Sequence, residues 1–240
     1  MRLTLLFLLT LLVAIVAGYH ARNCASTERE SLILFYRALK GQHWSKSWPI
    51  DDDDSDHCSW HGIVCNKQGK VTALQLSNNN LQGQLPRTSF CYPRLQVLHL
   101  QNNELTGSIY DTESAGIGVL KQLQYLDLSK NKLSGKIPTG LCELYRSLMY
   151  VDLSDNRISG HIPECFDERF KATMKGFNVK CNFLTGTIPE CFKDLVYLEQ
   201  FWVNCQKGRG FRPCKCPLYE MNEDALKCGN VHCDKECIAW

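Results

Sequence analysis

The thirteen residues LDLSKNKLSGKIP, from Leu126 to Pro138, recur along the chain in the same frame. Ungapped copies begin at Leu74, Leu98 and Val151, and a more divergent copy begins at Phe177. The asparagines that align are Asn79, Asn103, Asn131, Asn156 and Asn182, spaced by 24, 28, 25 and 26 residues. A nearly fixed spacing of this length indicates a solenoid of stacked coils.

Each residue type in the repeat has a role that its chemistry predicts. In the L-x-L segment, alternate side chains of a short strand enter the core and the intervening ones face outward, so successive strands stack in parallel. The asparagine after each strand can bond backbone groups of the neighbouring coil, which predicts a ladder of buried carboxamides. Glycine permits the bend that follows, and proline cannot donate a hydrogen bond to a ladder. These glycines and prolines are Gly83, Gly107, Gly135, Gly160, Gly186, Pro86, Pro138, Pro163 and Pro189.

Both ends of a solenoid need caps, because one coil cannot bury its own apolar edge. At the N-terminal end, Thr27 and Glu30 have the spacing of a helix capping box. The apolar residues that follow at helical spacing are Leu32, Phe35, Tyr36 and Leu39. We therefore expect a helix that covers the first coil. After Trp44 and Trp48, the segment CSWHGIVC brackets an apolar pair with Cys58 and Cys65, which predicts a disulfide-stapled hairpin or turn.

The helix, the paired tryptophans, CSWHGIVC and the L-S-G-x-I-P repeats together resemble the extracellular plant-type leucine-rich repeat family, over roughly residues 26–206. The resemblance implies an α/β repeat fold, a right-handed leucine-rich repeat solenoid with parallel strands on its concave face, an N-terminal helical cap and a cysteine-rich C-terminal cap. It also implies binding of peptides, receptors or pathogen enzymes, as in receptor-kinase ectodomains and polygalacturonase-inhibiting proteins. The chain departs from the family pattern in its few repeats, its cysteine-rich end and its lack of an N-x-S/T acceptor.

The N-terminal segment has the order of a secretory signal, with Arg2, an apolar run from Leu3 to Ala17, and Gly18. The run is shorter than the roughly 20 residues that span a bilayer. We expect a signal peptide at 1–18, an N-terminal cap at 24–70, repeats at 71–206 and a cysteine-rich cap at 207–240. The repeats are five plus a partial sixth, which ends where Gln206 replaces the expected asparagine. The expected location is secreted, without a transmembrane segment.

Charge and cysteine usage narrow the classes of partner. The chain has 27 basic and 25 acidic side chains, and this balance argues against nucleic acid. Its 14 cysteines all follow the signal segment, which favours disulfides in an oxidising compartment. The five tail cysteines are Cys214, Cys216, Cys228, Cys233 and Cys237, whose spacing fits a disulfide-bonded cap better than a zinc site. We expect no metal and no cofactor.

Two further disulfides are possible from the repeat register. Cys181 and Cys205 each precede the ladder position by one, so they would lie side by side on adjacent strands, about 4.8 Å apart. Cys165 and Cys191 occupy the same place in two copies of IPECF and would stack on the convex side. Cys24, Cys91 and Cys142 are left without an assigned partner.

Catalysis is not expected, because no nucleophile-base-orienter set, phosphate loop or metal helix motif occurs. Asp127 and Asp152 fall at the same outward position of neighbouring strands, which could indicate a carboxylate pair. L-D-L-S is, however, a common spelling of the strands in the family that the chain resembles. The acidic run that begins at Asp51 lacks the glycine and distal glutamate of a calcium loop, so we expect a solvated loop.

The outward strand positions form the predicted binding surface. Core packing does not require Tyr125, Tyr150 or Trp202 there, and exposed aromatics beside Asp and Ser are typical of protein-recognition surfaces. The candidate ligand-binding residues are Val97, His99, Gln101, Tyr125, Asp127, Ser129, Tyr150, Asp152, Ser154, Asn178, Lys180, Gln200 and Trp202. The sheet would offer about 400 Å², about half a standard partner footprint, which suits a peptide.

The sequence therefore predicts a secreted leucine-rich repeat protein that binds a peptide or protein partner through its concave sheet, in extracellular recognition, signalling or defence. The partner could be a receptor or a secreted enzyme. The alternatives are an inhibitor of a secreted polysaccharide-degrading enzyme and a structural cell-surface or matrix protein.

Overall fold

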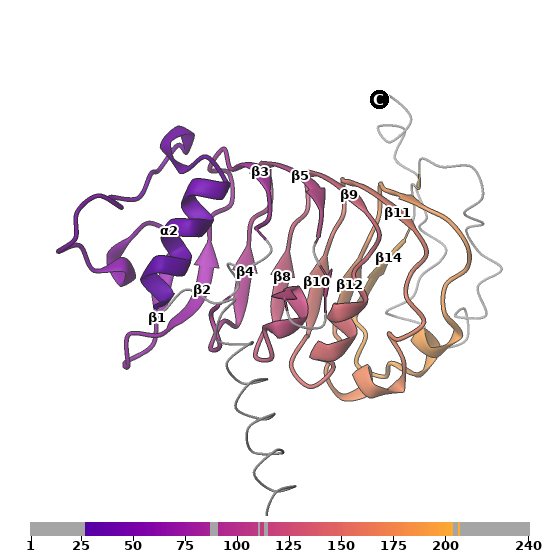
Figure 1. The fold of residues 1–240 in the computed structure, drawn as a ribbon. Coiled ribbons are helices and arrows are strands. Elements are labelled where there is room, and N and C mark those ends of the chain that lie inside the picture. The colour runs from indigo at the N-terminus through magenta and orange to yellow at the C-terminus, as the bar shows by residue number, and fades with distance from the viewer. Residues whose placement is uncertain (1–26, 87–90, 110, 113–114, 204–205, 207–240) are drawn as a thin grey trace, which may run out of the picture.

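A computed structural model describes residues 27–86, 91–109, 111–112, 115–203 and 206. The coils stack side by side from the helix α2 at one end to the strand β14 at the other (Figure 1). This arrangement is the predicted solenoid. The predicted signal peptide at 1–18 and the cysteine-rich cap at 207–240 lie outside the described residues, so these boundaries, like those of the cap at 24–70 and the repeats at 71–206, stay predictions.

The main sheet lines the concave face and has the order β1-β2-β4-β8-β10-β12-β14. All neighbours in it run parallel except β1 and β2, which are antiparallel. Its strands are β1 (Ile63–Cys65), β2 (Val71–Gln75), β4 (Val97–His99), β8 (Tyr125–Asp127), β10 (Tyr150–Asp152), β12 (Gly176–Asn178) and β14 (Gln200–Trp202). Each coil after the first thus adds one parallel strand, as the L-x-L pattern predicts.

A second sheet runs along another edge of the solenoid, in the order β13-β11-β9-β5-β3 (Figure 1). Its strands are β3 (Gln82–Gln84), β5 (Glu104–Ser108), β9 (Lys132–Gly135), β11 (Arg157–Gly160) and β13 (Phe183–Leu184). A short antiparallel pair, β6 (Asp111–Thr112) and β7 (Ala115–Gly116), lies in the long second repeat. The L-x-L pattern alone does not predict this second sheet.

Short 3₁₀ helices complete the coils and the cap. They are η1 (Gly41–His43), η2 (His57–Ser59), η3 (Ile117–Val119), η4 (Thr139–Leu144), η5 (Glu168–Ala172) and η6 (Glu190–Asp194). Their apolar side chains, such as Leu141 and Phe170, are buried against the strand leucines. The core is therefore one continuous column that runs through all the coils, and the outward side chains of the main sheet are left free of it.

The predicted asparagine ladder is confirmed. Asn103 is typical: its Oδ1 accepts the Leu81 N–H at 2.9 Å, and its Nδ2 donates to the Leu76 carbonyl at 2.8 Å. Both groups belong to the preceding coil. Equivalent pairs of bonds are made by Asn131, Asn156 and Asn182.

The ladder continues one step further than the repeat pattern predicts. Gln206 accepts the Leu184 N–H through Oε1 at 2.9 Å and donates from Nε2 to the Val179 carbonyl at 2.8 Å. The glutamine carboxamide thus makes the bonds of a ladder asparagine. The sixth coil is consequently tied to the fifth, although its sequence departs from the repeat.

Two backbone positions in each of the first five coils adopt left-handed geometry. One is the predicted glycine, as at Gly135, where φ is 81° and an added Cβ would lie 2.9 Å from the Ser108 Cβ. The other directly precedes each ladder asparagine and is never glycine. These residues are Asn78, Asn102, Lys130, Asp155 and Cys181, with φ between 53° and 56°. The tight exit from each strand therefore imposes a backbone conformation that side-chain-bearing residues adopt only at a cost.

The N-terminal cap forms as predicted. The helix α2 (Glu28–Ala38) begins with the capping box, in which the Thr27 hydroxyl accepts the Glu30 N–H and the Glu30 carboxylate accepts the Thr27 N–H, each at 3.1 Å. The predicted apolar face is buried, with Leu32, Phe35, Tyr36 and Leu39 at most 7% exposed. Trp44 and Trp48 pack on that face.

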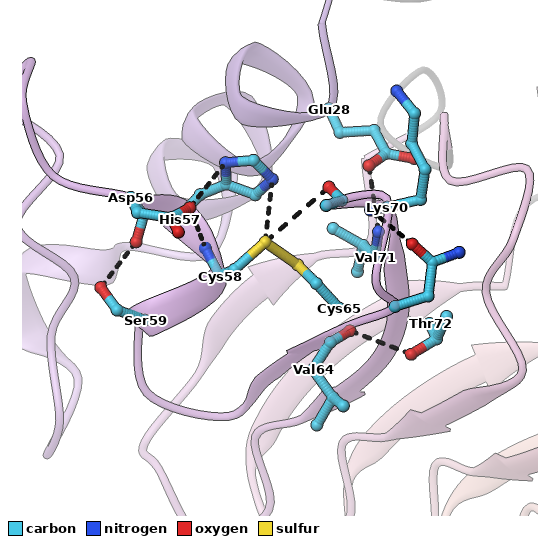
Figure 2. The surroundings of a disulfide bond; sticks show 12 residues. Glu28, Asp56, His57, Cys58, Ser59, Val64, Cys65, Lys70, Val71 and Thr72 are labelled. Carbon is cyan, nitrogen blue, oxygen red and sulfur yellow. Dashed lines mark hydrogen bonds and ion pairs between the residues drawn. A yellow bond between two sulfur atoms is a disulfide. The ribbon is translucent and has the colours of Figure 1, made fainter.

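The predicted bridge between Cys58 and Cys65 is present (Figure 2). It joins η2 to β1 and so closes the turn between them, the second of the two predicted forms, while β1 goes on to form an antiparallel hairpin with β2. Glu28 connects this hairpin to the helix, because its Oε2 accepts the Val71 N–H at 3.0 Å. The first coil is thereby tied to the cap through both the β1 strand and the helix α2.

The predicted pairing of Cys165 with Cys191 is wrong. Cys165 is bonded to Cys142 instead, with 5.7 Å between their Cα atoms. Cys142 follows Ile137 by five residues and Cys165 follows Ile162 by three, so the bridge is diagonal between coils. The strand register therefore does not carry over to the convex side, where 3₁₀ turns shift residues of adjacent coils.

The other cysteines are only partly described. Cys91 is also disulfide-bonded. Cys181 is buried at a left-handed position, and its predicted partner Cys205 lies outside the described residues. That pair stays a prediction, as does the disulfide-bonded cap of the tail cysteines, which likewise lie outside the described residues together with Cys24.

Candidate functional site

The register of the main sheet aligns two rows of outward side chains as the repeat alignment predicts. In the first row, Val97, Tyr125, Tyr150, Gly176 and Gln200 are direct neighbours. In the second row, the direct neighbours are His99, Asp127, Asp152, Asn178 and Trp202. The predicted site residues of β4 to β14 are therefore brought together on one face. Parallel pairing in register is what places like positions of successive coils side by side.

Tyr125 and Tyr150 form a stacked pair in the first row. Their ring centroids are 5.2 Å apart and their planes differ by 9°. The Tyr150 hydroxyl donates to Glu199 Oε2 at 3.5 Å. Partial burial and the nearby Glu199 carboxylate both raise the pKa of Tyr150, so the phenol stays protonated and keeps its hydrogen bond to Glu199.

Gly176 makes room for this stack, a role that the repeat alignment does not assign. A Cβ built on Gly176 would lie 2.5 Å from Cδ1 of Tyr150, so any side chain there would push the ring away. The φ angle of Gly176 is not among the positive values, so backbone geometry does not demand glycine. The signal that could have revealed it is a glycine inside a strand, which often marks a close approach of another group.

Asp127 and Asp152 lie opposite each other in the second row and are held by local hydrogen bonds. Asp127 Oδ1 accepts the Ser129 N–H at 3.0 Å and the Ser129 hydroxyl at 2.7 Å. Asp152 Oδ1 accepts the Ser154 N–H at 2.9 Å, and its Oδ2 accepts Asn178 Nδ2 at 2.8 Å. The two carboxylates are thus fixed in orientation and do not swing freely in solvent.

The surroundings of Asp152 change the pKa of its carboxyl group. Burial raises the pKa of Asp152, and the neighbouring charge of Asp127 adds to this effect, while the hydrogen bonds from Ser154 and Asn178 oppose it. Two carboxylates kept close in a partly dry setting repel each other. A cation placed between them would relieve that repulsion.

Three predicted contact residues are buried and act as supports. Ser129 and Asn178 are 7% exposed and Ser154 is 3% exposed. Their polar atoms face the two aspartates, as the hydrogen bonds above indicate. Of the other predicted residues, Val97, His99, Gln101 and Lys180 are half-buried, and Gln200 and Trp202 are exposed.

The two rows enclose a shallow pocket of about 230 Å³ on the main sheet. Trp202, 43% exposed, is one of its walls. The side chains around it are His99, Tyr125, Leu126, Asp127, Tyr150, Val151, Asp152, Gly176, Phe177, Asn178, Gln200 and Trp202. The lining includes two carboxylates and four aromatic residues, Tyr125, Tyr150, Phe177 and Trp202, and none of the lining residues is lysine or arginine.

One cluster in the described chain has the residue types of a metal site. It consists of His57, Cys58 and Cys65, within the N-terminal cap (Figure 2). Both cysteine sulfurs are already joined to each other, so they are not available as thiolate ligands. His57 is left as a single potential ligand, and the cluster has no features of a metal centre.

The stacked strands, the asparagine ladder and the capped first coil define a leucine-rich repeat solenoid with a plant-type N-terminal cap. Residues 25–66 match the leucine rich repeat N-terminal domain, and residues 94–112, 122–144 and 147–168 match the leucine rich repeat. The chain belongs to the plant-type leucine-rich repeat family. No helix within the described ranges has the length and apolar character needed to cross a membrane.

The curated relatives are plant receptor-like proteins and kinases. The chain is 36% identical to phytosulfokine receptor 1 of Arabidopsis thaliana over 121 residues, which is 50% of this chain and 11% of that protein. It is 40% identical over 121 residues to receptor-like protein 7 of the same plant, covering 49% of this chain and 12% of that protein. The match thus spans only about a tenth of these relatives.

Solved structures give the same fold. The PEPR1–AtPEP1 complex has a TM-score of 0.64 at 28% identity, covering 75% of this chain and 25% of that chain. The BIR2 ectodomain of Arabidopsis thaliana has a TM-score of 0.59 at 30% identity, covering 82% and 98%. RGFR1, a plant peptide hormone receptor solved with RGF2, has a TM-score of 0.55 at 32% identity, covering 63% of this chain and 22% of that chain. A plant ice-binding protein has a TM-score of 0.64 at 28% identity, covering 76% of this chain and 57% of that chain. The fold alone therefore does not select the ligand.

Proposed function

We propose that this protein is an extracellular recognition module whose main sheet binds an extended peptide or a segment of a partner protein. The observation that carries the proposal is the pocket of aromatic and acidic side chains on the outward face of β8, β10, β12 and β14. Stacked Tyr125 and Tyr150 form its floor together with Gly176, and Trp202 stands at its C-terminal side.

The solenoid does not need these aromatics for its own stability. The inward residues of the same strands, including Leu126, Val151 and Phe177, are buried and already belong to the core. Large aromatic rings left on a strand face are unusual unless they contact something, because Tyr and Trp supply most of the energy of many interfaces. A partner that covers them would gain that energy without disturbing the core.

The similar structures support a peptide as the ligand. One of them is the plant peptide hormone receptor RGFR1 in complex with RGF2. The size of the sheet agrees with this class of ligand, since about 400 Å² is about half the footprint that a folded partner uses. An extended peptide fits across six strands, while a large enzyme would also need the loops.

The test is capture from extracellular fluid by immobilised protein, followed by mass spectrometry of the bound peptides and proteins. The variants are Tyr150→Ala and, as a matched control, Tyr197→Ala, because Tyr197 is 59% exposed but lies outside the pocket. We expect one set of peptides to bind the wild type and the Tyr197 variant and to be lost from the Tyr150 variant.

Equal recovery of every ligand by all three proteins would contradict the proposal. Recovery of a polysaccharide-degrading enzyme, in a manner that depends on the pocket, would replace the peptide by the inhibitor alternative. Absence of any captured molecule would favour a structural role for the solenoid.

A further inference from the structure

We propose that the pocket selects a peptide by charge, placing an arginine or lysine side chain at Asp127 and Asp152 and an acidic group of the same peptide in a neighbouring basic groove. This inference rests on the proposed peptide-binding function and names the class of peptide. It follows from two oppositely charged surfaces that share the same strands.

The acidic part of the surface is preorganised for a cation. Asp127 uses only Oδ1 in the hydrogen bonds that the described residues make to it, so Oδ2 still has its acceptor capacity. Asp152 lies directly opposite, and the pocket lining offers no lysine or arginine to neutralise either carboxylate. A guanidinium can bond a carboxylate through two parallel N–H groups. The Tyr125 and Tyr150 rings beside it offer cation–π contact as well.

The basic part is a groove of about 310 Å³ along the edge where the chain enters the strands. Lys121, Arg146 and Lys175 line it, together with glutamine, serine and threonine side chains, and no aspartate or glutamate is among its lining residues. Lys121 has a partner in Glu143, 3.7 Å away and largely solvent-exposed. Lys175 makes no ion pair with any described residue, so its charge is available to a ligand.

The two surfaces adjoin, because their residues are consecutive along the strands. Gln124, Met149 and Lys175 line the groove and directly precede Tyr125, Tyr150 and Gly176 of the first row. Lys175 stands three positions before Asn178, which is the direct neighbour of Asp152. Three strand residues span about 10 Å, so an extended peptide would reach from one surface to the other in about three residues.

The distance between the two surfaces sets the spacing of charged residues expected in a peptide ligand. A basic residue should occur two to four positions from an acidic residue, since a shorter or longer separation would leave one charge unpaired. Removing the two carboxylates should abolish only the preference for a basic residue in the peptide. Removing the cations of the groove should abolish only the preference for an acidic residue in the peptide.

The probe is a phage-displayed library of random twelve-residue peptides, selected on immobilised full-length protein. Four proteins are compared with a control: the wild type, Tyr150→Ala, the Asp127→Asn/Asp152→Asn variant and the Lys121→Gln/Arg146→Gln/Lys175→Gln variant. The control carries Lys193→Gln and Asp194→Asn, which change exposed charges away from both surfaces. Circular dichroism and thermal melting establish that each variant is folded.

We expect wild-type and control selections to be enriched at least about threefold in paired basic and acidic residues at the stated spacing. Each charge variant should lose its own half of the pattern. One peptide selected on the wild type is then synthesised with and without its basic residue. Replacing that residue by alanine should weaken binding to the wild-type protein about tenfold, and binding to the Asp127→Asn/Asp152→Asn variant by less than about twofold. Such a difference is the signature of direct coupling between two groups.

The failures of the two proposals are distinguishable. Peptides that require Tyr150 but show no paired charges would overturn this inference and leave the proposed peptide-binding function standing. A library that yields no peptide dependent on Tyr150 would overturn both.

Discussion

At the scale of the residue, the most informative position is Gly176, because its lack of a side chain lets the Tyr150 ring lie over the sheet. Gly176→Ala should tilt that ring out of its stack with Tyr125 and weaken the ligand about fivefold. Titration calorimetry with a selected peptide measures the change. The same substitution in a Tyr150→Ala background should have little further effect on affinity. An equal loss in both backgrounds would mean that Gly176 does not act through Tyr150.

Lys130 is a second informative residue, because its backbone conformation determines how a substitution there changes the free energy of unfolding. Its side chain is exposed and its φ of 53° is costly for any residue with a Cβ. Lys130→Gly should therefore raise the free energy of unfolding by about 0.5–1 kcal/mol, as measured by urea denaturation. Arg157→Gly, at an exposed position inside β11, should lower it by a similar amount. Destabilisation by Lys130→Gly would show that the lysine side chain outweighs the backbone cost.

The raised pKa of Asp152 gives a pH dependence with a definite sign. A carboxyl group whose folded pKa exceeds its ordinary value of 3.8 binds protons more readily in the folded state. Its contribution to stability is full below the ordinary pKa and is lost as pH rises through the folded pKa. The wild type should therefore gain stability relative to Asp152→Asn as the pH falls from 7 to about 4. Urea unfolding at both pH values tests this, and a relative loss for the wild type would contradict the assigned direction.

At the scale of the structural element, the ladder asparagine links neighbouring coils by buried hydrogen bonds from its side chain. Asn131 accepts from the Leu105 N–H and donates to the carbonyls of Leu100 and Leu128, all in a buried setting. Asn131→Ala leaves the buried Leu105 N–H without its Oδ1 acceptor, while the Leu100 and Leu128 carbonyls keep the bonds from Asn103 and Asn156. The change should therefore cost about 1–3 kcal/mol of unfolding free energy, measured by chemical denaturation. Lys136→Ala, on the exposed surface, should change it by less than about 0.5 kcal/mol. Similar small losses for both would mean that water replaces the ladder.

Periodicity predicts those elements whose cause is local or repeated. The capping box, the apolar helix face and the Cys58–Cys65 bridge depend on residues close in sequence, and the strand register depends on the fixed place of Asn131 and its equivalents. The second sheet does not appear in the pattern, because its pairing uses backbone groups that any residue supplies. The Cys142–Cys165 bridge was missed because equal repeat positions do not face each other on the convex side.

In the candidate site, the outward positions of residues could be predicted from the repeat, but the packing of side chains between coils could not. The outward positions of Tyr125, Tyr150 and Trp202 follow from alternation along each strand, so the sequence is enough to group them. Packing between rows is different, because it depends on side-chain volume at neighbouring coils. The room that Gly176 leaves for a ring, and the burial of Ser154 beneath Asp152, emerge only once the coils are stacked.

At the scale of the whole molecule, the proposed recognition surface and the core lie on opposite sides of the main sheet. Inward leucines such as Leu128 and Leu153 belong to the continuous core, while the outward aromatics Tyr125, Tyr150 and Trp202 line the pocket. The proposed peptide site depends on this separation, and so does the proposed pairing of an acidic pocket with a basic groove. Substitutions on one face should therefore change one property and spare the other.

The most direct test of this claim measures affinity and stability on the same proteins. Calorimetric titration of a selected peptide and thermal melting are applied to the wild type, the Tyr125→Ala/Tyr150→Ala/Trp202→Ala variant and the Leu128→Ala variant. We predict that the triple variant stays folded and binds the peptide at least about fivefold more weakly. Leu128→Ala should instead lower the free energy of unfolding by about 2–5 kcal/mol. A folded triple variant that binds the peptide as tightly as the wild type would contradict the account.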